Sequence, residues 1–194
     1  RLAKLEAEQQ TKAARNNPAN ATKETPWANT LGMKFVPVAG TEVLFCVWET
    51  RVKDYAAYAA SNSGADGSWK DPVYEGQKVT PTEDCPVVNV SWEDARAFCA
   101  WLTKQERAAG KLSGSQSYRL PADWEWSVAV GLNESRNGTP KDKSGKIPDV
   151  YPWGTWPPPN RAGNYDDYSV SKIPGFADGY ERTAPVGSFA VNRY

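Results

Sequence analysis

Histidine is absent from this chain of 194 residues, and its absence excludes several kinds of catalytic centre. A Ser-His-Asp triad, a His-assisted cysteine nucleophile, a His-containing zinc site and a two-His iron site all require imidazole. No run of about 18 apolar residues occurs, so we predict no membrane span. The chain begins with Arg1 and has no signal-peptide pattern, which we interpret as the start of a fragment or of a processed product.

An excess of charge of one sign is also lacking, because 23 Lys and Arg residues balance 23 Asp and Glu residues. We therefore expect neither nucleic acid nor an anionic membrane as a partner. The apolar share of 40% and the charged share of 24% are typical of a chain that folds around a core. Nine Trp and nine Tyr residues predict that this core must bury broad, flat rings.

Cysteine is scarce, and its spacing is uninformative about metals. Cys46, Cys85 and Cys99 form no CxxC motif, and their odd number leaves at least one of them unpaired within the chain. An internal disulfide, a bridge to something outside the chain and plain buried thiols all remain open. The cysteines do not determine the redox compartment, so the localisation stays unknown.

The N-terminal segment differs in composition from the rest. It is rich in Ala, Glu, Lys and Gln, with a thin apolar stripe formed by Leu2 and Leu5. Pro18 ends the helical pattern, because the residue before a proline avoids helical backbone angles. We predict a helical leader or linker over residues 1–25, with a solvated tail as the alternative, and a domain over residues 26–194.

The next segments carry short elements. Apolar alternation over residues 33–38 and 43–48 predicts a hairpin, and residues 51–60 fit a helix capped by Thr50. Residues 61–85 are polar and are predicted as a long loop.

The most regular pattern follows this loop. Residues 86–90 are typical of a short strand, and Ser91 with Asp94 resembles a capping box at a helix start. Apolar residues recur at helical spacing over 95–102, and Gly110 is a natural end for the helix.

Regular patterns then become rare. Residues 118–121 are predicted to begin another short helix, with Trp126 facing inward and Gly131 ending it. Arg119 and Glu125 are predicted to form an ion pair that anchors this helix. Residues 132–194 show almost no periodicity and need ring packing, bound ions or both to hold them. Local patterns thus predict an irregular α+β fold.

Several motifs in a fixed order make the chain resemble the sulfatase-modifying factor family, also called the formylglycine-generating enzyme domain. The resemblance covers residues 30–194. Its motifs are WETRVKDYAAY at 48–58, PVVNVSWEDARAFCAWL at 86–102, RLPADWEW at 119–126, PWG at 152–154, Asn164, and TAPVGSF at 183–189. The resemblance implies a C-type-lectin-like fold with a small mixed sheet, few short helices and much irregular loop.

Family enzymes oxidise a cysteine of a sulfatase to formylglycine with molecular oxygen and bind Cu⁺ through two cysteines. Thiolates suit this soft ion, so the lack of histidine does not exclude such chemistry. In the family the cysteine pair follows Gly-Leu-Tyr-Asp-Met and Gly-Asn-Val-Trp-Glu-Trp motifs, which would come after Tyr194. We therefore expect the last third of the domain to lie beyond this sequence, and no catalytic residue is assigned. Cys99 stands where some relatives have a cysteine bridged to that region.

The resemblance also implies a structural Ca²⁺ site. Family members hold the ion with an Asn side chain, the next carbonyl, an Asp fourteen residues on and a carbonyl two further. The residues at these positions are Asn164, Tyr165, Asp178 and Tyr180. Oxygen ligands suit this hard cation, and simple turn formation by Asn164 and Asp178 is the competing interpretation.

Two function hypotheses follow. The first is a formylglycine-generating oxidase whose cysteine pair lies in the absent part. The second is a non-catalytic, calcium-stabilised module that binds a ligand or a protein within a larger protein. The expected partners are a protein or peptide substrate or ligand, and a domain or chain that completes the fold. Tryptophans are predicted mostly in the core, with a ligand groove as the alternative: Trp92, Trp101, Trp124, Trp126 and Trp153.

Overall fold

The computed structural model describes residues 17–132, 134–151, 153–165 and 173–190. Most of the predicted leader therefore lies outside the described residues. The short 3-10 helix η1 (Pro18–Asn20) begins the described part, where the side chain of Asn17 accepts a hydrogen bond from the backbone N–H of Ala19.

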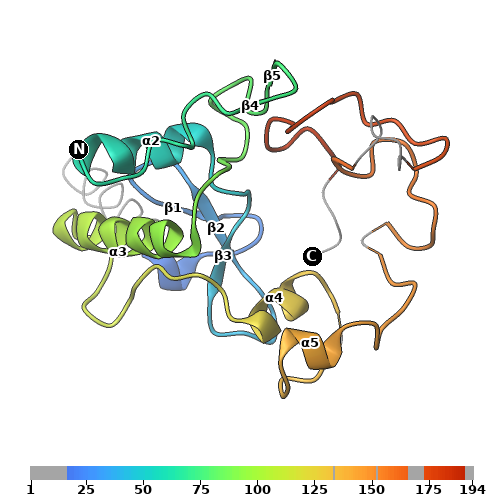
Figure 1. Cartoon of the computed structure of the whole chain (residues 1–194). Coiled ribbons are helices and arrows are strands. Elements are labelled where there is room, and N and C mark those ends of the chain that lie inside the picture. The colour runs from blue at the N-terminus through green and yellow to red at the C-terminus, as the bar shows by residue number, and fades with distance from the viewer. Residues whose placement is uncertain (1–16, 133, 152, 166–172, 191–194) are drawn as a thin grey trace, which may run out of the picture.

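A three-stranded antiparallel sheet lies at the centre of the molecule (Figure 1). Its strands are β1 (Trp27–Ala28), β2 (Lys34–Pro37) and β3 (Leu44–Cys46), in that order. The predicted hairpin is confirmed, with Phe35 of β2 opposite Cys46 of β3. The sheet presents Phe35 to the core because alternate side chains of a strand point to the same face.

Helix α2 (Val52–Ser61) follows the sheet, as the sequence predicts. The predicted cap at Thr50 is wrong, because Arg51 occupies the N-cap position. The carboxylate of Asp54 accepts a hydrogen bond from the backbone N–H of Arg51 at 3.1 Å, which fixes the first turn.

Helix α3 (Trp92–Ala108) confirms the prediction for this segment. The hydroxyl of Ser91 accepts a hydrogen bond from the backbone N–H of Asp94 at 3.1 Å, and the Asp94 carboxylate accepts one from Ser91 in return. The helix is followed by Gly110, whose φ of 68° lies in the left-handed region that glycine adopts without strain.

Aromatic rings dominate the core between α2, α3 and the sheet. Tyr55 and Tyr58 of α2 contact Phe98 of α3, with ring centroids 5.8 and 5.9 Å apart. This agrees with the expectation that the fold buries many rings. The buried cluster consists of Trp27, Met33, Phe35, Tyr55, Tyr58, Trp69, Phe98 and Leu102.

Two local predictions between these helices fail. The predicted loop contains a hairpin of β4 (Val73–Tyr74) and β5 (Gln77–Lys78), whose strands are too short to give an alternating pattern. Its turn places Glu75 and Gly76 at positive φ. The strand predicted over residues 86–90 is absent, because this backbone makes only a single bridge, from Pro86 to Arg51.

Helix α4 (Asp123–Ala129) begins later than predicted. Arg119 forms the predicted pair with Glu125, with Nη1 donating to Oε2 at 2.6 Å and Nη2 to Oε1 at 2.7 Å. The carboxylate also accepts the backbone N–H of Ala122 at 2.8 Å, so Glu125 faces inward. Its neighbour Trp126 is 57% exposed, and the prediction that Trp126 faces inward is wrong.

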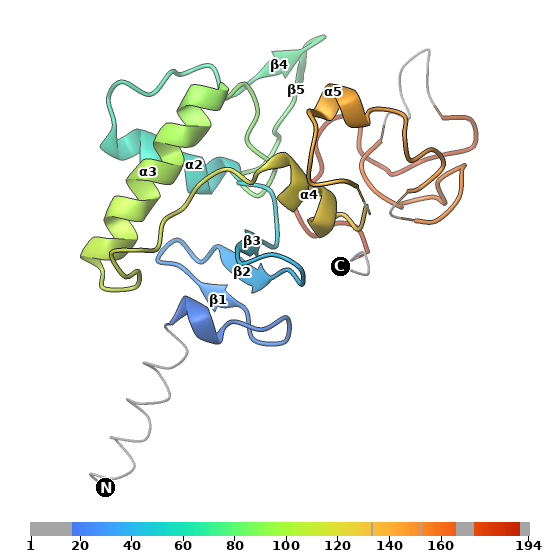
Figure 2. The same ribbon diagram turned by 90° about the horizontal axis from the view of Figure 1, so that it is seen from below.

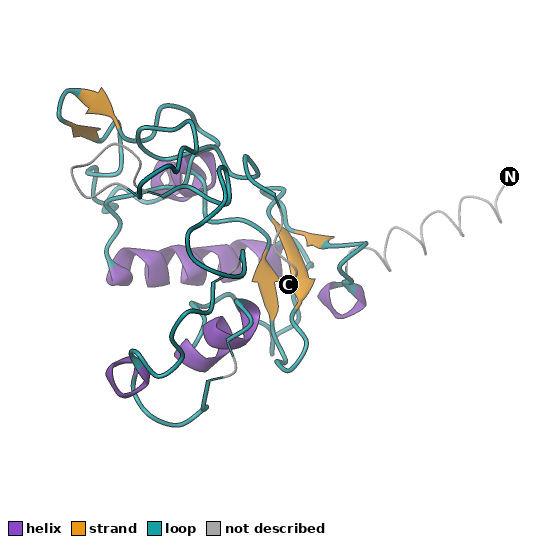
Figure 3. Ribbon diagram, turned by 90° about the vertical axis from the view of Figure 1, so that its right-hand side faces the viewer, coloured by secondary structure: helices purple, strands orange, loops and turns teal. Residues whose placement is uncertain are grey.

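Beyond α4 the chain is almost entirely irregular, as predicted. The only further helix in the described ranges is the short α5 (Pro140–Lys143). Figure 2 shows the C-terminal part mostly as loops, on the side of the molecule away from the α2–α3 pair, and Figure 3 shows that loops make up much of the side that faces the viewer.

The content of the fold matches the expected small mixed α and β class with few helices. The lectin-like topology stays a prediction. Among the described residues, no helix combines the length and the apolarity that crossing a bilayer requires.

Candidate functional site

A groove with a volume of ≈ 500 Å³ lies between segments that are far apart in the sequence. Most of the residues that line it are apolar or aromatic, polar and apolar atoms share its surface, and Glu49 is the only charged residue in the lining. The lining comprises residues 47–49 after β3, residues 86–88 before α3, residues 164–165, residues 183–187 and Phe189.

Backbone hydrogen bonds hold two of these segments to their neighbours. The N–H of Val87 donates to the carbonyl of Thr50 at 2.9 Å, and the N–H of Val186 donates to the carbonyl of Asp84 at 3.0 Å. The segment from Asp84 to Val87 therefore joins the N-terminal and C-terminal walls of the groove.

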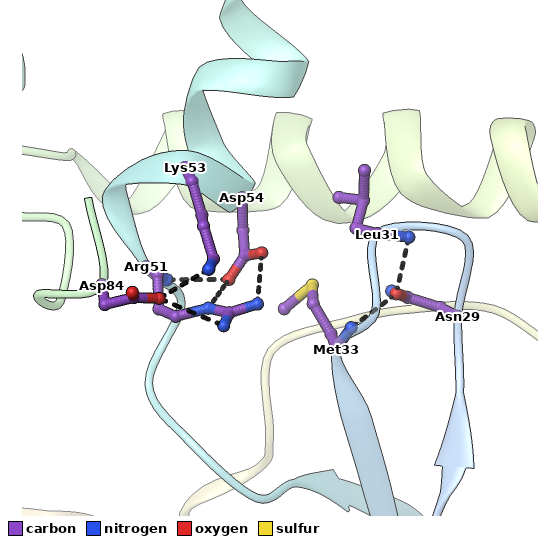
Figure 4. Close-up of polar contacts among 7 residues, drawn as sticks. All are labelled: Asn29, Leu31, Met33, Arg51, Lys53, Asp54 and Asp84. Carbon is purple, nitrogen blue, oxygen red and sulfur yellow. Dashed lines mark hydrogen bonds and ion pairs between the residues drawn. The ribbon is translucent and has the colours of Figure 1, made fainter. Parts of the chain in front are cut away.

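A charge network with a buried Arg51–Asp54 pair at its centre lies next to this junction (Figure 4). The guanidinium of Arg51 donates to Asp54 through Nε at 2.8 Å and through Nη2 at 2.9 Å. Nη1 also reaches Asp84 at 3.4 Å, and Lys53 pairs with the same carboxylate at 2.6 Å. Hydrogen bonding to Asp54 raises the pKa of Arg51, and the hydrogen bond from Lys53 lowers the pKa of Asp84. Both groups are therefore held in their charged forms.

Trp48 connects this network to the groove. Its side chain lines the groove and is 37% exposed. The Arg51 guanidinium lies 5.7 Å from the centroid of the indole, and Lys34 Nζ lies 6.0 Å from it. Both distances are within the range of cation–π attraction.

The predicted calcium residues come together beside the groove. Asp178 is fully buried, and its carboxylate accepts the backbone N–H of Tyr165 at 2.9 Å and that of Tyr180 at 2.7 Å. The side chain of Asn164 donates through Nδ2 to the carbonyl of Arg182 at 2.7 Å. The structure thus brings the backbones of Tyr165 and Tyr180 to the carboxylate of Asp178. Asn164 lies next to Tyr165 in the groove lining.

The Ca²⁺ ligands that the resemblance implies are one carboxylate, the amide oxygen of Asn164 and the carbonyls of Tyr165 and Tyr180, which are oxygen ligands of the kind this hard cation takes. In the structure both oxygens of the Asp178 carboxylate accept backbone N–H groups. Within the described ranges there is no group of three or more Asp, Glu, Cys or His side chains arranged for a metal. Neutral oxygens would therefore supply most of the ligands.

The cysteines do not fit a copper site. Cys46, Cys85 and Cys99 are all free thiols, so no internal disulfide is present. Cys46 lies on β3, Cys99 on α3, and Cys85 is buried 3.4 Å from the hydroxyl of Thr82. Burial raises the pKa of Cys46 and of Cys99, which opposes the thiolate that Cu⁺ requires.

The tryptophans that the sequence singled out do not line the groove, and the one that does was missed. Trp101 packs against the core, whereas Trp92 is 59% exposed and contacts Arg96. Trp48 was read as the end of a strand. Its place at the start of the WETRVKDYAAY motif was the signal that could have identified it.

Comparison with known proteins relates the chain to one family. The model of the sulfatase-modifying factor enzyme 1-like domain matches residues 6–194. The chain is 33% identical over 135 residues to a formylglycine-generating enzyme of Thermomonospora curvata, covering 65% of this chain and 34% of that protein. It is 31% identical over 132 residues to a formylglycine-generating enzyme of Bos taurus, covering 66% of this chain and 28% of that protein.

A relative with a different name is equally similar. An inactive C-alpha-formylglycine-generating enzyme 2 of Bos taurus is 32% identical over 121 residues, covering 62% of this chain and 31% of that protein. The chain spans about a third of the length of these curated relatives. Similarity alone therefore does not separate an active protein from an inactive one.

Proposed function

This chain belongs to the sulfatase-modifying factor family, and from that premise we propose that the protein containing it is a formylglycine-generating-enzyme-like oxidase. Its substrate is a protein, and the reacting group is a cysteine side chain that is converted to formylglycine. The C–S bond breaks, the sulfur leaves as hydrogen sulfide and one oxygen atom of O₂ becomes the aldehyde oxygen. The other oxygen atom is reduced to water by two electrons from an added thiol, which becomes a disulfide. In this proposal the chain supplies the framework and a substrate-binding surface, and no catalytic residue is assigned within it.

The groove is the observation that carries the proposal. Its volume of ≈ 500 Å³ lies within the usual range for binding pockets, about 300–1,000 Å³. Apolar and aromatic walls such as Trp48, Val87 and Phe189 suit the side chains of an extended polypeptide. Two walls are tied through Asp84 and Val186, so the surface is largely preformed.

The metal ions have separate roles in this proposal. Ca²⁺ is structural, held by Asn164, Tyr165, Asp178 and Tyr180, and it fixes loops beside the groove. Cu⁺ would require a cysteine pair outside this sequence, because the thiols of the chain do not fit it. Bound copper would supply oxygen activation.

A non-catalytic binding module is the second candidate. It is favoured by the similarity to a relative named inactive. In that case the groove binds a protein ligand without turnover.

One experiment separates the two candidates. The natural full-length protein, loaded with copper and calcium, is incubated in air with a thiol reductant and a synthetic peptide that spans the modified cysteine of a sulfatase. Mass spectrometry follows the formylglycine product, an oxygen electrode follows consumption, and fluorescence anisotropy measures binding of the labelled peptide. A peptide with serine in place of the cysteine is the control.

Turnover with the cysteine peptide, and none with the serine peptide, supports the oxidase. Binding without turnover rejects the oxidase in favour of the module. Absence of both rejects a sulfatase peptide as the ligand in either role.

A further inference from the structure

Trp48 lines the groove, and the charged side chain of Arg51, which lies outside the groove lining, contacts it. Arg51 is buried, and neither it nor Asp54 is among the lining residues. Two parallel hydrogen bonds from Arg51 to Asp54 fix the plane of the guanidinium, and such paired geometry restricts a side chain more than a single contact does. The fixed guanidinium then contacts the indole of Trp48 at 5.7 Å.

The C-terminal wall contacts the same indole. A Cβ added at Gly187 would lie 3.7 Å from two atoms of the Trp48 ring, so the backbone of this glycine approaches the ring closely. Gly187 has a φ of 80°, where a side chain would also be strained. Trp48 is therefore held between Arg51, the N-cap residue of α2, and Gly187 of the C-terminal segment.

Asp84 couples these two sides. Its carboxylate contacts Arg51 at 3.4 Å, and its backbone carbonyl accepts the N–H of Val186, the residue before Gly187. Asp84 thus links Arg51, which contacts the indole of Trp48, to the C-terminal wall of the groove, which lies against the same indole.

We propose that Arg51 is a positioning residue that sets the orientation of Trp48 through the Asp54 and Asp84 carboxylates, and that Trp48 is the residue that determines which peptides the groove accepts. This inference rests on the proposed function, since it assigns roles within the same groove. A peptide with a large apolar or aromatic side chain near its modified cysteine would be favoured, because it stacks on an indole held in one orientation.

A double-mutant cycle on the full-length protein tests the mechanism, with the labelled sulfatase peptide as the probe. Trp48→Ala is expected to weaken peptide binding about tenfold or more, as loss of an aromatic anchor does. Arg51→Gln is expected to weaken it about threefold or more, through the lost cation–π contact. In the Trp48→Ala background, Arg51→Gln should have no further effect, because it acts only through the indole.

The second readout is independent of any ligand. With 5-fluorotryptophan incorporated, ¹⁹F NMR gives one resonance per tryptophan, and Trp48→Phe identifies that of Trp48. Arg51→Gln should shift and broaden this resonance. Arg96→Gln is the matched control, since Arg96 lies 4.6 Å from the ring of the exposed Trp92, outside the groove lining, and should leave the Trp48 resonance and peptide binding unchanged.

The outcomes are distinguishable. If the wild-type protein binds no peptide, the proposed function fails, and the Trp48 resonance still reports whether Arg51 orients it. If the wild type binds but the two mutations are additive, or the Trp48 resonance does not move, the positioning role is overturned while the proposed function stands. Should Arg51→Gln fail to fold, Asp84→Asn, whose side chain is 48% exposed, replaces it in the cycle and in the NMR comparison. It removes one of the two carboxylates that hold the guanidinium, so its expected effects are smaller in size but the same in direction.

Discussion

The buried carboxylate of Asp178 accepts a hydrogen bond from the backbone N–H of Tyr165, 2.9 Å away and thirteen residues earlier in the chain. Its second oxygen accepts the N–H of Tyr180 at 2.7 Å. One side chain therefore ties together two loops in a part of the molecule that has almost no regular structure. Such a tie replaces the backbone ladders that hold helices and sheets.

Asp178→Ala should destabilise the protein strongly. It leaves two partly buried N–H groups without their acceptor, at about 1–2 kcal/mol each in unfolding free energy. Asp178→Asn keeps one acceptor but loses the charge, so we expect a smaller loss without calcium and no stabilisation when calcium is added. Thermal unfolding with Ca²⁺ and with EDTA measures both effects.

The control for this experiment is Asp149→Asn, which alters an exposed acid in the same irregular half. It should keep the full response to calcium. Wild-type protein at a calcium concentration of 100 times its Kd should gain about 2.7 kcal/mol. An equal calcium response in wild type and Asp178→Asn would show that the ion binds elsewhere or not at all.

The ion pair of Arg119 and Glu125 makes the stability of the folded protein depend on pH in the acidic range. The hydrogen bond from Arg119 lowers the pKa of Glu125, with a further contribution from the N–H of Ala122, and burial opposes them. A carboxyl whose pKa is lower in the folded state stabilises the fold above its unfolded pKa of about 4.3. This contribution is lost as the pH falls through the folded value.

Glu125→Gln should therefore lower the unfolding free energy at pH 7 by about 1–2 kcal/mol, a moderate loss because the Arg119 side chain is half exposed. Between pH 5 and pH 3, wild-type stability should fall more steeply than that of the variant. Urea unfolding across this pH range measures the difference. Asp71→Asn removes an exposed pair with Lys78 and should change stability little.

Elements with a strong local signal were predictable from the sequence. The α3 helix begins at Ser91 because its hydroxyl and the Asp94 carboxylate satisfy each other's N–H groups, which is a purely local interaction. The partner of Arg119 was predictable for the same reason, since it lies only six residues away.

Features that depend on distant contacts were not predictable. Trp126 has the spacing of an inward residue. The neighbouring Glu125 faces inward instead, because its carboxylate accepts hydrogen bonds from the Arg119 guanidinium and from the backbone N–H of Ala122. The groove also escaped prediction, because its walls meet only through contacts such as that between Val186 and Asp84, about a hundred residues apart. Only the family resemblance grouped Asp178 with Tyr165 and Tyr180, because no local sequence pattern marks these residues as neighbours.

The three thiols should react slowly in the folded protein. Burial raises the pKa of Cys46 and of Cys99, which disfavours their reactive thiolate forms, and Cys85 is fully buried and therefore shielded from reagents in solution. Iodoacetamide labelling followed by peptide mass mapping should give little modification before unfolding and complete modification after it. A disulfide between any two of them in the non-reduced peptide map would contradict the structure.

Glu106 of α3 is fully buried and forms no ion pair within the described part of the chain. Its Oε1 accepts the backbone N–H of Thr30 at 2.8 Å, and its Oε2 has no hydrogen-bond partner among the described residues. Burial, followed by the charge of Glu106, raises the pKa of Tyr118, which places this charge close to the phenol.

A comparison of two substitutions tests what this charge costs. Glu106→Gln keeps an acceptor for Thr30 and removes an unpaired buried charge, so the unfolding free energy should stay equal or rise by about 1 kcal/mol. Glu106→Ala leaves the Thr30 N–H unsatisfied and opens a cavity beside α3, so it should lose about 2–4 kcal/mol. Urea unfolding at pH 7 measures both variants. A large loss in Glu106→Gln would mean that the negative charge itself is paired in the folded protein, for example with a cation bound from solution.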